Sequence, residues 1–366
     1  MSVTDSGPTL DPIAANTPPG PGSDLHSGSL AGRGMLLVAL GAVVLGALSW
    51  LPFGAVNWAR WAVVSVVAYV AITYVASRVV ESPRHATDRT ATALMTSAFL
   101  VVCLPLISVM WTVVSKGLPR FDWAFFSETR LGVTGAGGGA YQAIVGTIII
   151  TALTACFAVP FGIFTAIYLV EYSRGSRFSK AVTGMVDVMT GIPSIVAGLF
   201  AYALFVVIDG PGHRSGLAAA VALTLLMTPI VVRATEEMLR LVPNELREAS
   251  YALGVPKWKT IVKVVLPTAV AGILTGVVLA IARVIGETAP LLVTVGIIRS
   301  VNKNPIEGRM ATLPVFAYDA YAFPSIPREA SIDRAWTGAL VLMAIVALLF
   351  TTARILSHVL KPKGER

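Results

Sequence analysis

The sequence predicts an all-α polytopic membrane protein, and three observations favour this fold class. Of the 366 residues, 55% are hydrophobic and only 13% are charged, whereas soluble domains carry about 25% charged residues. Several apolar stretches reach the roughly 20 residues that a helix needs to cross a bilayer. These stretches are continuous, whereas the strands of a membrane β-barrel alternate apolar and polar residues.

The N-terminal quarter of the chain predicts a tail followed by an accessory pair of helices. Residues 1–34 are rich in Pro, Gly, Ser, Thr and Asp. We expect them to form a disordered cytoplasmic segment, because they contain too little apolar surface to bury. Apolar stretches at about 35–52 and 60–77 then predict a transmembrane hairpin, which together with the following loop makes an accessory domain over 35–90.

A second domain is expected over 91–357, with six further spans. These cover about 92–115, 141–170, 181–208, 216–235, 268–298 and 335–357, with boundaries good to a few residues. The prediction is therefore about eight transmembrane helices, a six-helix core plus the N-terminal hairpin. A charged segment at 236–266 interrupts the core.

The formal net charge of +8 indicates membrane topology rather than a nucleic-acid partner, because the chain has no basic low-complexity arm. If residues 1–34 are cytoplasmic, the loops and tails on their side hold fifteen Lys and Arg, against ten on the opposite side. Basic residues favour the cytoplasmic face. We therefore expect a multi-pass protein of the plasma membrane, in contact with lipid, with both termini in the cytoplasm.

Two other patterns argue against chemistry in this chain. Gly132–Gly139 is not followed by GK[ST], so we interpret it as a flexible outer turn rather than a loop that cradles a phosphate. Single, scattered histidines show no metal-ligand spacing. No catalytic residue, metal site or cofactor is predicted.

The charged segment has the pattern of two short helices. Pro243 suits a first helical turn, Glu245 and Glu248 favour the positive end of the helix dipole, and Gly254 is placed where a helix ends with positive φ. Val255-Pro256 then begins a second, lysine-containing helix that ends at Leu266-Pro267. On these residues alone, an amphipathic connector on the membrane surface and a docking element are both compatible with the pattern.

This segment also resembles the EAA loop of ABC-transporter permeases. The matching residues are Glu248, Ala249, Ser250, Gly254, Val264, Leu266 and Pro267. In that family the loop docks in a groove of a separate ATPase subunit. The resemblance therefore implies ATPase coupling through Glu248, Ala249, Ser250, Gly254, Val255 and Pro256. Because the chain lacks GxxxxGK[ST], ATP and Mg²⁺ would be bound by the partner ATPase.

Ionisable residues inside the predicted spans form a second candidate site. Arg283 and Glu287 are four residues apart in the seventh span, Arg233 ends the sixth and Asp187 lies in the fifth. Such residues mark functional sites in membranes, and guanidinium groups bind oxyanions in a bidentate manner. A structural Arg283–Glu287 ion pair, and an Arg233 that only marks a helix end, remain alternatives.

Three expected breaks in the spans support a transport path. They are Gly191-Ile192-Pro193, Thr228-Pro229 and Gly286–Pro290. Non-helical backbone is tolerated in a membrane where it is buried in protein or lines a cavity.

Over about 92–357 the chain resembles the PstA-type permease subunits of phosphate ABC importers. The stretches that carry the resemblance are TGIPSIVAGLF (190–200), LREASYALGVPKWKTI (246–261) and LAIARVIGETAPLL (279–292). The resemblance implies ATP-driven phosphate import, with Arg233, Arg283 and Glu287 in the substrate path. It also implies a second, PstC-like permease, a dimer of ATPase subunits and an extracytoplasmic phosphate-binding protein.

Three other functions remain open from the sequence. The cargo of such an importer could be another oxyanion, molybdate or sulfate. A secondary anion transporter would work alone, although the EAA-like loop and the lack of an inverted repeat argue against it. A membrane component of phosphate sensing would be compatible with transport.

Overall fold

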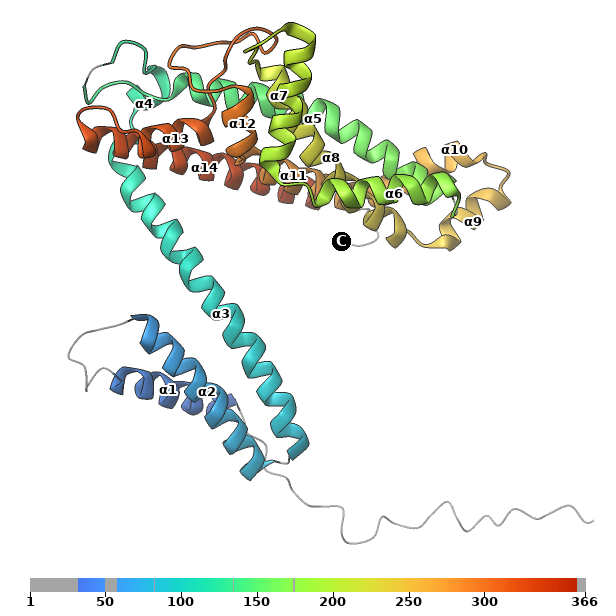
Figure 1. The fold of residues 1–366 in the computed structure, drawn as a ribbon. Coiled ribbons are helices and arrows are strands. Elements are labelled where there is room, and N and C mark those ends of the chain that lie inside the picture. The colour runs from blue at the N-terminus through green and yellow to red at the C-terminus, as the bar shows by residue number, and fades with distance from the viewer. Residues whose placement is uncertain (1–31, 50–57, 82, 134, 174, 361–366) are drawn as a thin grey trace, which may run out of the picture. The chain divides into compact units, whose positions relative to one another are not determined.

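The structure, a computed structural model, describes residues 32–49, 58–81, 83–133, 135–173 and 175–360, and all regular secondary structure in this part of the chain is helical (Figure 1). In chain order the elements are α1 (Gly32–Leu48), α2 (Trp58–Val80), α3 (Pro83–Gly117), η2 (Leu118–Arg120), α4 (Trp123–Ser127), α5 (Tyr141–Ile167), η3 (Tyr168–Tyr172), α6 (Arg177–Thr190), α7 (Ser194–Asp209), α8 (Gly216–Leu241), α9 (Asn244–Ala252), α10 (Lys257–Thr260), η4 (Ile261–Val265), α11 (Leu266–Ile285), α12 (Ala289–Thr294), α13 (Leu313–Ala322) and α14 (Arg328–Leu360). The fold class predicted from the sequence is confirmed. The predicted disordered segment falls almost entirely outside the described residues.

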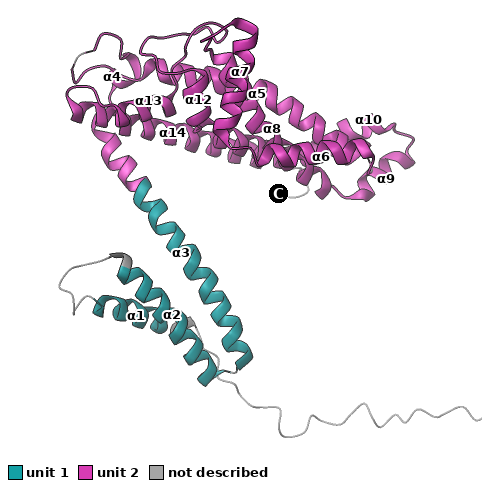
Figure 2. Cartoon of the chain, viewed as in Figure 1, with its two compact units in different colours: residues 1–109 teal, residues 110–366 magenta. Residues whose placement is uncertain are grey.

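The chain forms two compact units, residues 1–109 and 110–366 (Figure 2). In unit 1, α1 packs against α2. Their crossing is close at Gly46, where an added Cβ would lie 2.0 Å from the Ser65 hydroxyl oxygen.

At the end of α2, the Glu81 carboxylate accepts hydrogen bonds from Ser77 and from Arg89 of α3. Helix α3 is continuous from Pro83, so the predicted boundary at 90/91 falls inside a helix.

Unit 2 is built around a bundle in which α8 packs against α5, α7 and α11. Glycines let the helix backbones approach one another, as is common in membrane bundles. An added Cβ at Gly162 of α5 would lie 2.6 Å from Val231 of α8, and one at Gly276 of α11 would lie 2.5 Å from Ala234 of α8. The most extensive packing in the unit is therefore centred on α8, the helix that carries Arg233.

Within the described residues, six single helices are long and apolar enough to cross a membrane, and α6 with α7 forms a further, bent candidate. The break predicted at Gly191-Ile192-Pro193 in the fifth span is confirmed, because α6 and α7 meet there at an angle of 106°. The seventh predicted span, 268–298, is shorter than expected, because α11 ends at Ile285 and α12 begins at Ala289. Helix α1 is shorter than the other candidates.

One predicted break is absent. Helix α8 continues through Thr228-Pro229 as an α-helix, with Pro229 buried. The Thr228 hydroxyl donates to the Thr224 carbonyl at 2.8 Å. Membrane helices tolerate proline where neighbouring helices and hydroxyl side chains compensate the lost backbone bond, and the close packing of α5 on this part of α8 provides that support.

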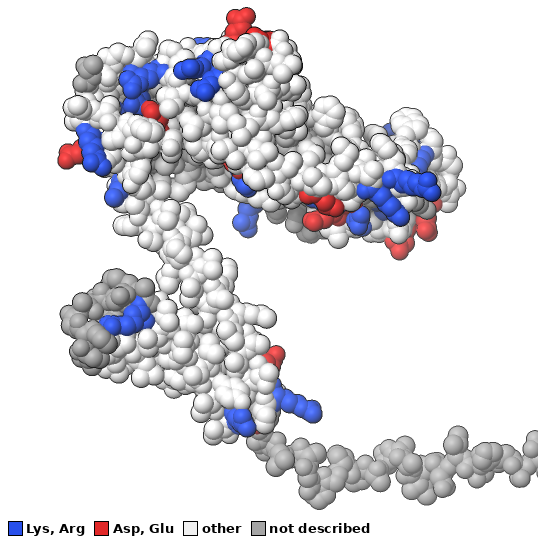
Figure 3. Space-filling view, in the orientation of Figure 1, with Lys and Arg blue, Asp and Glu red and all other residues white. Residues whose placement is uncertain are grey.

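Charged side chains gather mainly at the two ends of unit 2 on the face shown in Figure 3. One end carries α9 and α10, and the other carries α4 and α13 (Figure 1). We call these the α9 end and the α13 end. The mostly uncharged surface between them is the band expected to face the bilayer core.

Candidate functional site

The first part of the candidate site is the pair formed by Arg283 and Glu287. Helix α11 ends two residues after Arg283, at Ile285, and the Glu287 N–H donates to the Val284 carbonyl at 3.0 Å. The chain thus folds back so that Arg283 Nη1 donates to Glu287 Oε1. The Glu287 side chain is only 12% exposed, whereas that of Arg283 is 63% exposed. The pair therefore presents its guanidinium outward and keeps its carboxylate inside.

The second part is centred on Arg233 of α8, which contacts two carboxylates. Its Nη1 donates to Glu236 at 2.9 Å, and its Nη2 donates to Asp187 of α6. Glu236 is buried and also accepts a hydrogen bond from Arg240. The sequence placed Arg233 and Asp187 in separate spans without pairing them, because they are 46 positions apart.

The two arginines lie at different levels along the same pair of helices. Helices α8 and α11 run antiparallel, since Gly272 packs on Met238 and Gly276 on Ala234. Extending this register places Arg283 level with a residue of α8 six positions before Arg233, or about 9 Å along the helix axis. Each level carries an arginine and at least one carboxylate, so positive charge can be offered to an anion at two successive points.

The EAA-like segment forms a helical hairpin at the α9 end. Helix α9 ends before Gly254, which has φ of 74° as predicted, and the Gly254 N–H donates to the Tyr251 carbonyl at 2.9 Å. Glu248, Ala249, Ala252 and Leu253 are exposed, with the Leu253 side chain almost fully so. These residues form an exposed face of charged and apolar character.

Two features of this hairpin differ from expectation. Ser250 is buried, and its hydroxyl shares a hydrogen bond of 2.8 Å with the Thr260 hydroxyl. The position therefore holds the two helices together. The second helix is not separate, because α10, the π-helical turn η4 and α11 run on without a break from Lys257 to Ile285.

A buried ion pair that the sequence did not reveal fastens α9 to the bundle. Arg247 donates to the Glu171 carboxylate through Nη2 at 2.7 Å and through Nε at 3.1 Å. It also donates to the carbonyls of Leu239 and Val242 at the end of α8. Glu171 lies in η3, the π-helical turn that ends α5. The pair borders a cleft of about 540 Å³ that also contacts Arg240, Glu248 and Tyr251.

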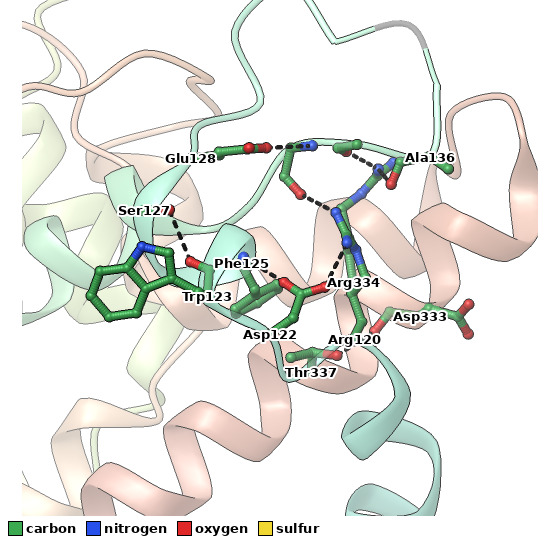
Figure 4. A network of polar contacts seen from close by, with 12 residues as sticks. Arg120, Asp122, Trp123, Phe125, Ser127, Glu128, Ala136, Asp333, Arg334 and Thr337 are labelled. Carbon is green, nitrogen blue, oxygen red and sulfur yellow. Dashed lines mark hydrogen bonds and ion pairs between the residues drawn. The ribbon is translucent and has the colours of Figure 1, made fainter.

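Arginine side chains bind the carbonyls of the glycine-rich loop at 135–138. Arg334 of α14 is fully buried, and its Nη1 donates to the carbonyls of Gly135, Ala136 and Gly137, the last at 2.6 Å (Figure 4). Arg120 Nη2 donates to the Gly138 carbonyl at 3.0 Å. The loop therefore binds guanidinium groups through its carbonyl oxygens, and these contacts hold it at the α13 end.

A second buried arginine ties the same end together. Arg130 Nη1 donates to Asp319 of α13 at 3.0 Å, across 189 residues of sequence. Burial lowers the pKa of the Arg130 guanidinium, while the Asp319 charge opposes that shift. The side-chain spacing in the sequence gives no local signal for either Arg130 or Arg334, since their partners are distant in the chain.

Comparison with known proteins places this architecture in one family. The family model described as "Binding-protein-dependent transport system inner membrane component" matches residues 158–364, and the chain belongs to this family. It is therefore a multi-pass membrane subunit of a transport system and not an enzyme.

Individual relatives are similar over most of their length. The phosphate transport system permease protein PstA 1 of Mycobacterium tuberculosis (strain ATCC 25618 / H37Rv) is 45% identical over 279 residues, which cover 75% of this chain and 89% of the relative. PstA of Mycobacterium leprae (strain TN) is 46% identical, with 75% and 89% covered. PstA of Pasteurella multocida (strain Pm70) is 40% identical, with 72% and 92% covered.

A solved structure supports the fold. The MetNI methionine ABC transporter in an inward-facing conformation contains a chain that matches with a TM-score of 0.50 and 21% sequence identity. The match covers 61% of this chain and 96% of that chain. This likeness concerns the fold alone.

Proposed function

We propose that this chain is the permease subunit of an ATP-driven importer of inorganic phosphate. The observation that carries the proposal is its 40–46% identity, over about nine tenths of their length, to proteins named as phosphate transport permeases. The site is compatible with that cargo, because two arginines at successive levels of the membrane provide bidentate donors for an oxyanion.

Arg233, Arg283 and Glu287 are the proposed substrate-path residues. Phosphate entering a low-dielectric path must replace its hydration with protein donors and positive charge. Arg283 presents an exposed guanidinium for that purpose, while the buried Glu287 holds it in place. Because Arg283 is exposed in the single chain, the path would be completed by a second, PstC-like permease that packs against this face.

The exposed face of α9 and the turn after it are the proposed contact with the ATPase. Glu248 and Ala249 are accessible, and the positive φ of Gly254 gives a sharp turn before Val255-Pro256. A rigid hairpin can pass a rigid-body movement from a partner to the spans. ATP and Mg²⁺ would be bound by two copies of this separate ATPase.

The orientation follows from the same proposal. The α9 end and both termini would lie in the cytoplasm, as the fifteen basic residues on that side favour. The α13 end would face an extracytoplasmic phosphate-binding protein, with Arg299, Arg309 and Arg328 of its loops available for contact.

Uptake of labelled phosphate tests the proposal directly. A bacterial strain that lacks its own phosphate permease subunit is complemented with this chain and the partner genes from the same source. We expect ATP-dependent phosphate uptake that molybdate and sulfate do not replace. Uptake of either of those anions in place of phosphate, or gradient-driven uptake by the purified chain alone, would refute the proposal in favour of the corresponding alternative.

A further inference from the structure

Arg233 contacts two carboxylates, Glu236 and Asp187, and the proposed path residues give no role to Asp187. Asp187 lies on α6, ten residues after the helix begins at Arg177, or about 15 Å along its axis. It therefore lies inside the bent candidate span formed by α6 and α7. Its side chain is 61% exposed in the single chain, although it accepts a hydrogen bond from Arg233. An exposed carboxylate at this depth is costly and calls for a function.

Asp187 is not needed to hold Arg233 in place. The buried Glu236, only 6% exposed, accepts from Arg233 Nη1 at 2.9 Å and lies one helical turn away on the same helix. Asp187 binds the other terminal nitrogen, Nη2, from a different helix. Glu236 thus fixes the arginine, and Asp187 is a second, accessible partner that an incoming anion meets at the same point.

The two levels of the path differ in which charge they present. At Arg283 the guanidinium is exposed and its carboxylate is buried, whereas at Arg233 the Asp187 carboxylate is more exposed than the guanidinium. An anion at the Arg233 level therefore meets both a donor and a carboxylate. A fully ionised oxyanion is repelled by that carboxylate, because it has no proton to share.

Phosphate differs from sulfate in this respect. At neutral pH inorganic phosphate keeps at least one proton and can donate a hydrogen bond through its hydroxyl, whereas sulfate and molybdate are fully ionised. An ionised carboxylate can only accept hydrogen bonds. A site built to pair with a hydroxyl discriminates against an analogue that lacks it, because the carboxylate then has no donor and only repels the anion.

We propose that Asp187 determines specificity in the transport path: it accepts a hydrogen bond from the hydroxyl of a protonated oxyanion whose other oxygens bind Arg233. Sulfate and other unprotonated oxyanions are excluded at this point. When the anion leaves, Asp187 again becomes the partner of Arg233 Nη2, which keeps the arginine neutralised within the membrane. This inference rests on the proposed function, since it concerns the same path.

The test uses the assembled transporter without the binding protein, because a binding protein would select the anion before it reaches the path. Equilibrium binding of labelled phosphate and labelled sulfate is measured on the purified, nucleotide-free complex. We expect the wild type to bind phosphate at least tenfold more tightly than sulfate. Arsenate, which is protonated like phosphate, should compete, and selenate should not.

Substitutions at Asp187 separate its chemistry from its size. Asp187→Asn offers an amide N–H to an unprotonated oxygen, so we expect sulfate and phosphate affinities to come within about threefold of each other. Asp187→Glu keeps the acceptor and should retain most of the wild-type preference. Asp209→Asn is the matched control, because Asp209 is an exposed carboxylate at the end of α7 that pairs with His213. Size-exclusion chromatography confirms that each complex is assembled.

Two results would overturn the inference. They are a wild-type complex that does not distinguish the two anions and an Asp187→Asn complex whose preference for phosphate over sulfate is unchanged. ATP-driven phosphate uptake by the complete system, binding protein included, is measured in parallel. If uptake is present and the preference does not depend on Asp187, only this inference fails; if phosphate uptake is absent, the proposed function fails.

Discussion

At the scale of single residues, each path arginine is neutralised by a carboxylate. Charged side chains inside a bilayer are costly when alone, and the pairing of Arg283 with Glu287 and of Arg233 with Glu236 lowers that cost. In the sequence, the i, i+4 spacing left the Arg283–Glu287 ion pair as one of two alternatives. The contact of Arg233 with Asp187 could not be predicted, because it depends on how α6 bends against α8.

Replacing Arg283 by Gln should abolish most transport while leaving assembly intact. The side chain is largely exposed, so the smaller amide fits, but it lacks the charge and the fork of donors that bind an oxyanion. We expect phosphate uptake to fall roughly 30-fold or more, measured in membrane vesicles with matched amounts of complex. Arg354→Gln, at an exposed position of α14, is the control. Wild-type uptake by the Arg283→Gln complex would remove this residue from the path.

At the scale of elements, the hairpin of α9 and α10 is held at two points. Ser250 of α9 is hydrogen-bonded to Thr260 of α10. Arg247 links α9 to the end of α5 through Glu171, and to the end of α8 through two backbone carbonyls. The sequence predicted the hairpin and its glycine turn, since both depend on local residue pattern. It did not predict Arg247 as a link, because Glu171 lies 76 residues away and in a π-helical turn.

The Arg247–Glu171 pair should couple α9 to the bundle rather than contact the ATPase. Arg247→Met leaves a buried carboxylate without its partner, which typically costs about 3–5 kcal/mol. We expect the number of ATP molecules hydrolysed per phosphate imported to rise several-fold, and Arg247→Met with Glu171→Gln to show a non-additive effect on thermal stability. An unchanged ATP-to-phosphate ratio in a stable Arg247→Met complex would contradict this role.

Gly254 should be required for docking rather than for folding. An added Cβ there meets no atom within 4 Å in the single chain, and the strain of positive φ costs a non-glycine residue about 1–2 kcal/mol. Gly254→Asp should therefore insert normally and lose co-purification with the ATPase. Gly212→Asp is a matched control with φ of 80° and equally open surroundings, between α7 and α8. Equal loss of the ATPase from both variants would show that backbone strain, and not the docking position, is the cause. Normal co-purification of Gly254→Asp with the ATPase would contradict a docking role.

At the scale of the whole molecule, composition and span length predicted the all-helical membrane fold, because both reflect the requirement that a bilayer imposes on every span. The Gly and Pro patterns predicted three breaks in the spans, and the structure has two of them. Gly191–Pro193 breaks a span, whereas Thr228-Pro229 does not. The difference depends on whether neighbouring helices support the proline, and this information is not local in sequence.

The packing of α1 against α2 as a separate pair predicts that the transport function resides in residues 83–366. The family match begins at residue 158, and α1 with α2 packs as a pair in unit 1. Deleting residues 1–81 removes two spans and leaves α3 complete, so α3 would still start on the same side of the membrane, where Arg84 and Arg89 favour the cytoplasm. We expect complex assembly and phosphate uptake within about twofold of wild type, because independent units contribute additively. Deleting only residues 1–49 removes one span and should reduce correct insertion. Loss of uptake in a correctly inserted 1–81 deletion would assign a transport role to the N-terminal helices.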